Sequence, residues 1–167
     1  VYQETERMPD LDSFLQGLDR AAEGWPMTMG WIDCLTRGRA MGRGILFRGR
    51  WARPSDQPPS EPPGPKRRLT MPVDLPSFLL NGLSMRAFNE LFYRKHWRRQ
   101  TRGVVHPEEF FHPLDKILSW NRGYGRRGFT QYQCVVPNRA GARRVLEILT
   151  AARAASFLCV VKDCGEE

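Results

Sequence analysis

The chain has 167 residues and a hydrophobic fraction of 41%, so it is long enough and apolar enough to fold as one domain with a buried core. No apolar run approaches the ~20 residues that a membrane-spanning helix needs, and the polar first residues are unlike a secretory signal. The net charge of +8 suits nucleic acid, anionic lipid or a phosphorylated substrate, and equally an arginine-rich solvated surface.

The cysteines do not follow a metal-binding pattern. The sequence contains no CxxC pair, and only Cys159 and Cys164 lie close together, so we expect no zinc site. Cys134 and Cys159 lie in apolar, strand-like contexts, which predicts that both are small core residues.

The first fifty residues predict a strand, a helix and a hairpin. Residues 1–6 are expected to end a strand, and Asp10 is a good N-cap for a helix. Alternating residues at 26–33 and 45–52 predict two paired strands around a loop rich in Gly and Arg. Four apolar residues recur at helical spacing and give the helix one core face: Leu11, Phe14, Leu15 and Leu18.

Residues 53–68 interrupt this pattern. They hold six prolines and no large apolar residue, so we predict a mobile, solvated loop. A proline-rich ligand for another domain is the sharper alternative for this segment.

The second half predicts two further helices and two further strands. Ser84 is expected to cap a helix over residues 85–96, and a second helix is expected over 139–155. Strands are expected at 129–136 and 157–162, an extended stretch at 100–106, and turns with a short helix at 107–120.

This order of elements predicts an α+β fold, an antiparallel sheet with helices on one face. Its beginning can be interpreted as a ferredoxin-like βαββ unit followed by part of a second. We treat residues 1–167 as one partial domain. The missing initiator Met and the end just after an apolar segment predict that it is a piece of a longer protein.

Two amides mark the predicted strand at residues 129–136. Because side chains alternate, Gln131 and Gln133 would share one face, and Tyr132 and Cys134 the other. A buried amide without a partner costs roughly 1–3 kcal/mol, so a polar ligand is one explanation of this pattern. A solvated face of an antiparallel sheet is the other.

Several segments resemble FAD-dependent oxidases of the vanillyl-alcohol-oxidase type. They are HPLD, WNRGYG and GFTQYQCVVP, with WIDCLTRGRAMGRGILFRG upstream and SFLCVVKDCG downstream, all in order. The resemblance is strongest to members that act on polyprenyl-phosphate sugars. It implies that this chain is part of the substrate-binding (cap) domain, a large antiparallel sheet with helices behind it.

The resemblance also implies roles for particular residues. Gln133 matches a glutamine that reaches both flavin and substrate. Substrate-binding positions are matched by Trp31, Gln131, Gln133, Leu158, Val160 and Lys162, and a loop over the pocket by His112, Leu114 and Trp120. Cys164 stands where the family has a bulky aromatic residue, and Phe111 where it usually has Tyr, so pocket shape and one hydroxyl contact differ here.

The same residues have plainer interpretations. Trp31 would equally suit a hairpin or core aromatic, a lysine at a strand end is usually solvated, and Leu114 and Trp120 suit core packing. We expect no residue of this chain to be a catalytic acid, base or nucleophile.

The cofactor implied by the resemblance is FAD, bound mainly by a domain absent from this chain, because no Gly-rich phosphate loop follows a strand here. The implied partners are that domain, a sugar or polyprenyl-phosphate sugar, and a membrane surface. The implied location is the bacterial cytoplasm or the periplasmic face of the membrane.

The alternative function is a basic ferredoxin-like nucleic-acid-binding module. Phe129 and Tyr132 would stack on bases in that case, but the chain lacks an RRM signature and RGFTQYQC matches it poorly. No nucleic acid is therefore expected, and a fragment that is inert alone is a third possibility.

Overall fold

The structure, a computed structural model, describes residues 1–56, 69–154, 156 and 158–162. The predicted mobile loop at 53–68 lies mostly outside the described residues, as does Cys164. The first residues of that loop form a 3-10 turn, Pro54–Asp56, in which Asp56 pairs with Arg50.

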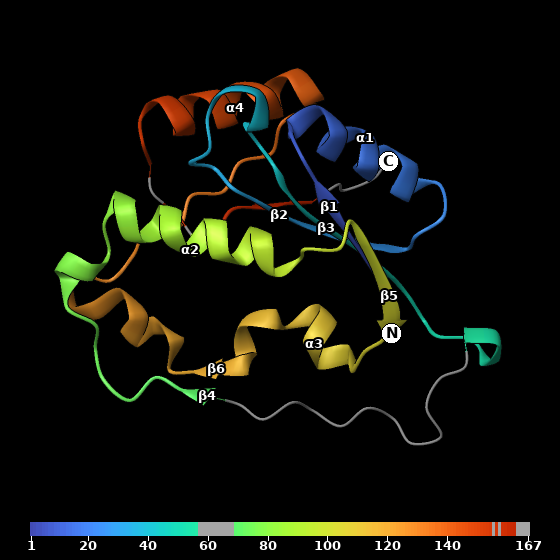
Figure 1. Cartoon of the computed structure of the whole chain (residues 1–167), viewed down its shortest axis with the longest axis horizontal. Coiled ribbons are helices and arrows are strands. Elements are labelled where there is room, and N and C mark those ends of the chain that lie inside the picture. The colour runs from blue at the N-terminus through green and yellow to red at the C-terminus, as the bar shows by residue number, and fades with distance from the viewer. Residues whose placement is uncertain (57–68, 155, 157, 163–167) are drawn as a thin grey trace.

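A five-stranded antiparallel sheet forms the centre of the molecule (Figure 1), with strand order β5-β1-β3-β2-β7. Its strands are β1 (Tyr2–Met8), β2 (Met27–Ile32), β3 (Gly44–Arg50), β5 (Gln100–Val104) and β7 (Val160–Val161). The predicted α+β class is confirmed. The chain order β1, α1, β2, β3 follows the predicted βαββ unit, with β3 between β1 and β2, whereas the finer ferredoxin-like description stays a prediction.

Helix α1 (Leu11–Ala22) begins where the sequence predicts. The side chain of Asp10 accepts a hydrogen bond from the Ser13 backbone N–H at 2.8 Å, which satisfies one of the free amides of the first turn. Phe14 is fully buried against the sheet at Gly30, where an added Cβ would lie 2.1 Å from the Phe14 ring. The helix can therefore approach β2 this closely only because position 30 is glycine.

Helices lie on both faces of the sheet, whereas the sequence predicted them on one face. α1 covers the face to which Gly30 belongs, and α4 (Arg139–Ala151) joins the same core through Leu146 (Figure 1). Since neighbouring residues of a strand point to opposite faces, Trp31 faces the other way. Its ring packs 4.7 Å from that of Phe92 in α2 (Gly82–Lys95), so α2 covers the second face.

The second face also carries α3 (Pro107–Phe111), whose Phe110 contacts Gly49 of β3. The remaining elements are short. They are the parallel strands β4 (Leu69–Thr70) and β6 (Ile117–Leu118) and the 3-10 turns Gly38–Ala40, Ser77–Leu79, Pro113–Lys116 and Trp120–Arg127.

The start of α2 differs from the prediction. The N-cap is Asn81, not Ser84, and the helix begins three residues earlier than expected. Ser84 instead closes a capping box, because its hydroxyl accepts a hydrogen bond from the Asn81 N–H while the Asn81 side chain accepts one from Ser84. Asn81 and Ser84 are both good N-cap residues, so the sequence alone does not show which one caps the helix. The capping box uses both.

The predicted strand at residues 129–136 is wrong. These residues have no ladder partner among the described strands, and both Tyr132 and Val135 are more than four-fifths exposed. Alternation describes a side-chain pattern, whereas a strand also needs a neighbour for its backbone hydrogen bonds. β7 pairs over only two residues with β2, and α4 ends at Ala151 rather than 155.

Candidate functional site

Trp31 and Val160 lie side by side on the sheet face that carries α2. They are opposite each other in the antiparallel register of β2 and β7. Trp31 is buried, at 6% exposure, beneath Phe92, whereas Val160 is 44% exposed. The structure thus brings two of the predicted substrate residues together, the buried Trp31 and the half-exposed Val160.

Leu158 and Lys162 flank Val160 along the same strand direction. β7 covers only Val160 and Val161, so the shared face predicted for the three residues stays a prediction. Leu158 is 39% exposed, and Lys162 is exposed and makes no ion pair with a described residue. This end of the sheet therefore presents exposed apolar side chains close to the Lys162 ammonium group, which has no ion-pair partner among the described residues.

Gln131 and Gln133 are exposed, and within the described part of the chain neither amide has a hydrogen-bond partner. The prediction that Cys134 is a core residue is wrong, because its side chain is exposed. Tyr132, which was expected on the same face, is 82% exposed. Both amides are available to a ligand, but no sheet fixes their direction.

Cys159, the residue before β7, points into the core. The pKa of the Cys159 thiol is raised, first by its hydrogen bond with Cys34 and then by burial, and Cys134 lies close enough to add a smaller electrostatic effect. Cys34 is buried and Cys159 packs against the core, as predicted for Cys159. The contact of Cys159 with the core therefore anchors the chain just before β7.

Of the three residues predicted to cover the pocket, Trp120 belongs to a separate aromatic cluster. Trp120 opens the turn Trp120–Arg127 and packs 5.9 Å from Tyr124 and 5.4 Å from Phe129. His112 is the exposed C-cap of α3, and Leu114 lies in the turn Pro113–Lys116. The core-like packing favoured for Trp120 is thus observed, in a small cluster that holds the start of the Gln131 segment.

A buried carboxylate next to Trp31 is the feature that the sequence did not reveal. Asp33 is 1% exposed and accepts hydrogen bonds from the Thr36 hydroxyl at 2.6 Å and the Arg43 guanidinium at 2.8 and 3.0 Å. It also accepts from the Leu35 N–H and the Asn89 amide. Burial alone would raise the pKa of Asp33, but these hydrogen bonds outweigh it and lower the pKa.

This cluster positions α2 over Trp31. Asn89 is fully buried, and its amide also donates to the Ser156 carbonyl, two residues before Leu158. Arg43 reaches the same helix through Glu90 at 2.5 Å. The sequence signals this cluster only by an acidic residue just after an apolar strand, with arginines in the next loop. Asp33 and Asn89 lie 56 residues apart in the chain.

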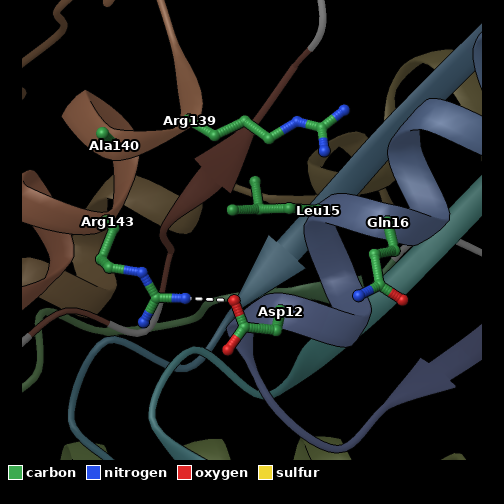
Figure 2. A pocket seen from close by; sticks show the side chains of 6 residues that line it. All are labelled: Asp12, Leu15, Gln16, Arg139, Ala140 and Arg143. Carbon is green, nitrogen blue, oxygen red and sulfur yellow. Dashed lines mark hydrogen bonds and ion pairs between the residues drawn. The ribbon is translucent and has the colours of Figure 1, made fainter.

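An open cavity of about 320 Å³ lies elsewhere, between α1 and α4 (Figure 2). Leu15 forms its floor, and Arg143 pairs with Asp12 across it. Arg139 is likewise paired, with Asp19. Because these charges are already matched and the cavity contains none of the predicted site residues, it is not the candidate site.

Neither a metal-binding cluster nor a membrane-crossing helix is found among the described residues. They contain no group of three or more His, Cys, Asp or Glu side chains that could hold a metal ion. In the same residues, no helix combines the length and the apolar character needed to cross a bilayer.

A comparison with curated proteins supports the resemblance seen in the sequence. The chain is 32% identical over 154 residues to decaprenylphosphoryl-beta-D-ribose oxidase of Mycolicibacterium smegmatis. The chain is similar to part of an oxidase. The match covers 88% of this chain but only 33% of that relative, so the chain spans about a third of the oxidase's length. A scan of known protein families finds no match.

Proposed function

We propose that this chain is the substrate-binding portion of an FAD-dependent oxidoreductase that oxidises a sugar alcohol, in particular one linked to polyprenyl phosphate. The observation that carries the proposal is the β2–β7 edge. There the buried Trp31 pairs with the half-open Val160, close in sequence to Leu158 and Lys162, and Lys162 has no ion-pair partner among the described residues. To this edge we assign Gln131 and Gln133, whose amides have no hydrogen-bond partner in the described part of the chain. The similarity to an oxidase over 88% of the chain supports it.

The amides of Gln131 and Gln133 would suit the isoalloxazine ring of a flavin better than its phosphates. An amide offers both donors and an acceptor, which suits the alternating N–H, N and C=O groups of an isoalloxazine edge. The described residues hold no Gly-rich phosphate loop after a strand. We therefore infer that Gln133 contacts the ring and that FAD is held mainly by a domain absent from this chain.

The residues of the chain would act by positioning. A bound flavin supplies the hydride acceptor, and the carbinol carbon of the substrate must be held against it. Gln131 and Gln133 would hydrogen-bond substrate hydroxyls, Lys162 would attract a phosphate or a sugar oxygen, and the apolar wall would exclude water. His112, Leu114 and Trp120 remain candidates for a cover over this edge.

The nucleic-acid alternative has less support. Phe129 stacks on Tyr124 with ring centroids 4.3 Å apart, so one of its two proposed base-stacking residues is occupied within the chain. Tyr132 alone remains open.

Anaerobic flavin bleaching tests the proposal. We expect the protein expressed from the full gene around this chain to purify with flavin and to lose its absorbance near 450 nm when a polyprenyl-phosphate pentose is added. We expect the 167-residue chain alone to bind no FAD after gel filtration. A full-length protein without flavin, or flavin that no sugar alcohol reduces, would overturn the proposal.

A further inference from the structure

Two cysteines lie together where β7 joins the sheet. Cys34 follows β2, and Cys159 immediately precedes β7. The Ile32 N–H donates to the Cys159 carbonyl oxygen at 2.9 Å, which extends the β2–β7 ladder by one pair. The Cys34 sulfur lies 3.6 Å from the carbonyl oxygen of Ser156, three residues before Cys159. Cys34 belongs to the buried core cluster and Cys159 packs against that cluster, so both side chains are on the same side of the sheet.

The two thiols form a hydrogen-bonded pair. Their hydrogen bond is the first cause of the lowered pKa of Cys34 and of the raised pKa of Cys159. Both cysteines are free, Cys34 is only 2% exposed, and Cys159 is partly exposed. Because the thiolate is the reactive form of cysteine, Cys34 is the better nucleophile of the pair. The proposed function gives neither thiol a task.

The strand next to this pair is weakly held. In the described structure β7 lies at the end of the sheet and pairs only with β2, over the two residues Val160 and Val161. A ladder this short opens at a small fraction of the free energy of global unfolding. Opening moves Cys159 and lets a small oxidant reach Cys34. A covalent bond between the two sulfurs would hold the strand in place where the ladder holds it least.

We propose that Cys34 and Cys159 are a redox-sensitive pair, which hydrogen peroxide converts to a disulfide that fastens β7 to β2. The Cys34 sulfur attacks one peroxide oxygen, the O–O bond breaks, and the other oxygen leaves as water with the thiol proton. The Cys159 sulfur then attacks the sulfenic sulfur of Cys34, which forms the S–S bond and releases a second water. Two thiols are oxidised, one peroxide is reduced, and a thiol reductant reverses the change. The inference is independent of the flavin proposal.

Peptide mapping of the whole chain tests the cross-link directly. Trypsin leaves the four cysteines in four different peptides, residues 21–37, 128–139, 154–162 and 163–167. After hydrogen peroxide treatment and alkylation of the remaining thiols, we expect peptide 21–37 joined to 154–162 as the main disulfide product, and its loss on reduction with dithiothreitol. Cys34→Ala and Cys159→Ser should each abolish this product. Cys134→Ser, which removes an exposed thiol, is the matched control and should retain it.

Thermal melting shows whether the bond fastens the strand. A disulfide between residues far apart in the chain restricts the unfolded state, so oxidised wild type should melt at a higher temperature than reduced wild type. Peroxide should cause no such rise in Cys34→Ala. The proposal is overturned if the main product joins peptide 128–139 or 163–167, if peroxide forms no disulfide, or if oxidation leaves the wild-type melting temperature unchanged. Mapping of the wild-type chain decides the pairing even where a variant fails to fold.

Discussion

At the scale of single residues, Asp33 explains how the candidate edge is held together. The carboxylate is almost fully buried and accepts five hydrogen bonds. Two come from the adjacent residues Leu35 and Thr36, and three come from Arg43 and Asn89, which lie further along the chain. Removing one partner of a buried pair leaves the other charge uncompensated, which is costly. Asp33 therefore ties α2 and the loop after β2 to the strand that carries Trp31.

Asp33→Asn should destabilise the domain by about 3–5 kcal/mol in chemical denaturation at pH 7, because Arg43 would lose its buried counter-charge. Asp12→Asn removes an exposed carboxylate of the same kind and should cost about 1 kcal/mol or less. A D33N loss as small as that of D12N would mean that the cluster does not hold α2.

The pH dependence of stability follows from the lowered pKa of Asp33. A carboxyl whose folded pKa is below its unfolded value contributes stability above the unfolded value, here 3.8, and loses it as the pH falls through the folded pKa. We expect wild-type stability to fall below pH 3.8 and this part of the fall to be absent in Asp33→Asn. Denaturant titrations between pH 2.5 and 6 measure it, and parallel curves for the two proteins would contradict the assignment.

At the scale of elements, α1 tests how closely a helix packs on the sheet. Gly30→Ala would place a Cβ 2.1 Å from the Phe14 ring, so the helix or the ring must shift. We expect a loss of about 1–3 kcal/mol or more from overpacking. Gly24→Ala, where no atom lies within 4 Å, is the control and should have little effect. Equal melting temperatures for the two variants would refute the close approach.

The segment at residues 129–136 gives the sharpest contrast between pattern and structure. Its amides lack a ladder in the described structure, so they should exchange with solvent far faster than those of β3, which is paired on both sides. Hydrogen exchange with mass spectrometry measures this difference. Protection equal to that of β3 would show that the segment is a sheet strand after all.

The sequence predicted what depends on local chemistry. The Asp10 cap, the apolar stripe of α1 and the alternation of β2 and β3 follow from side-chain spacing alone, and all three are found. It could not predict ladder partners, because Tyr132 and Cys134 alternate like core residues yet stay exposed. The Asp33 cluster was missed for a related reason: Asn89 meets Asp33 only through the fold.

At the scale of the whole molecule, the two faces of the sheet carry different kinds of residue. The face under α1 and α4 holds the core, whereas the β2–β7 edge of the other face presents Trp31 and Val160. The Gln131 segment joins no ladder in the described structure, and its role at this edge belongs to the proposed function. The proposed function assigns this edge to the substrate and the flavin ring.

The most direct test of this assignment is the kinetic effect of Gln133→Ala in the full-length flavoprotein. Loss of a hydrogen bond to substrate or flavin costs roughly 1–3 kcal/mol, so kcat/KM for the polyprenyl-phosphate sugar should fall about 5- to 150-fold. Because Gln133 is exposed and makes no hydrogen bond with a described residue, the melting temperature should not change. Gln16→Ala, which removes the same side chain from the exposed side of α1, is the matched control and should leave both values unchanged. A Gln133→Ala enzyme with wild-type kcat/KM, or with a loss no greater than that of Gln16→Ala, would contradict the assignment.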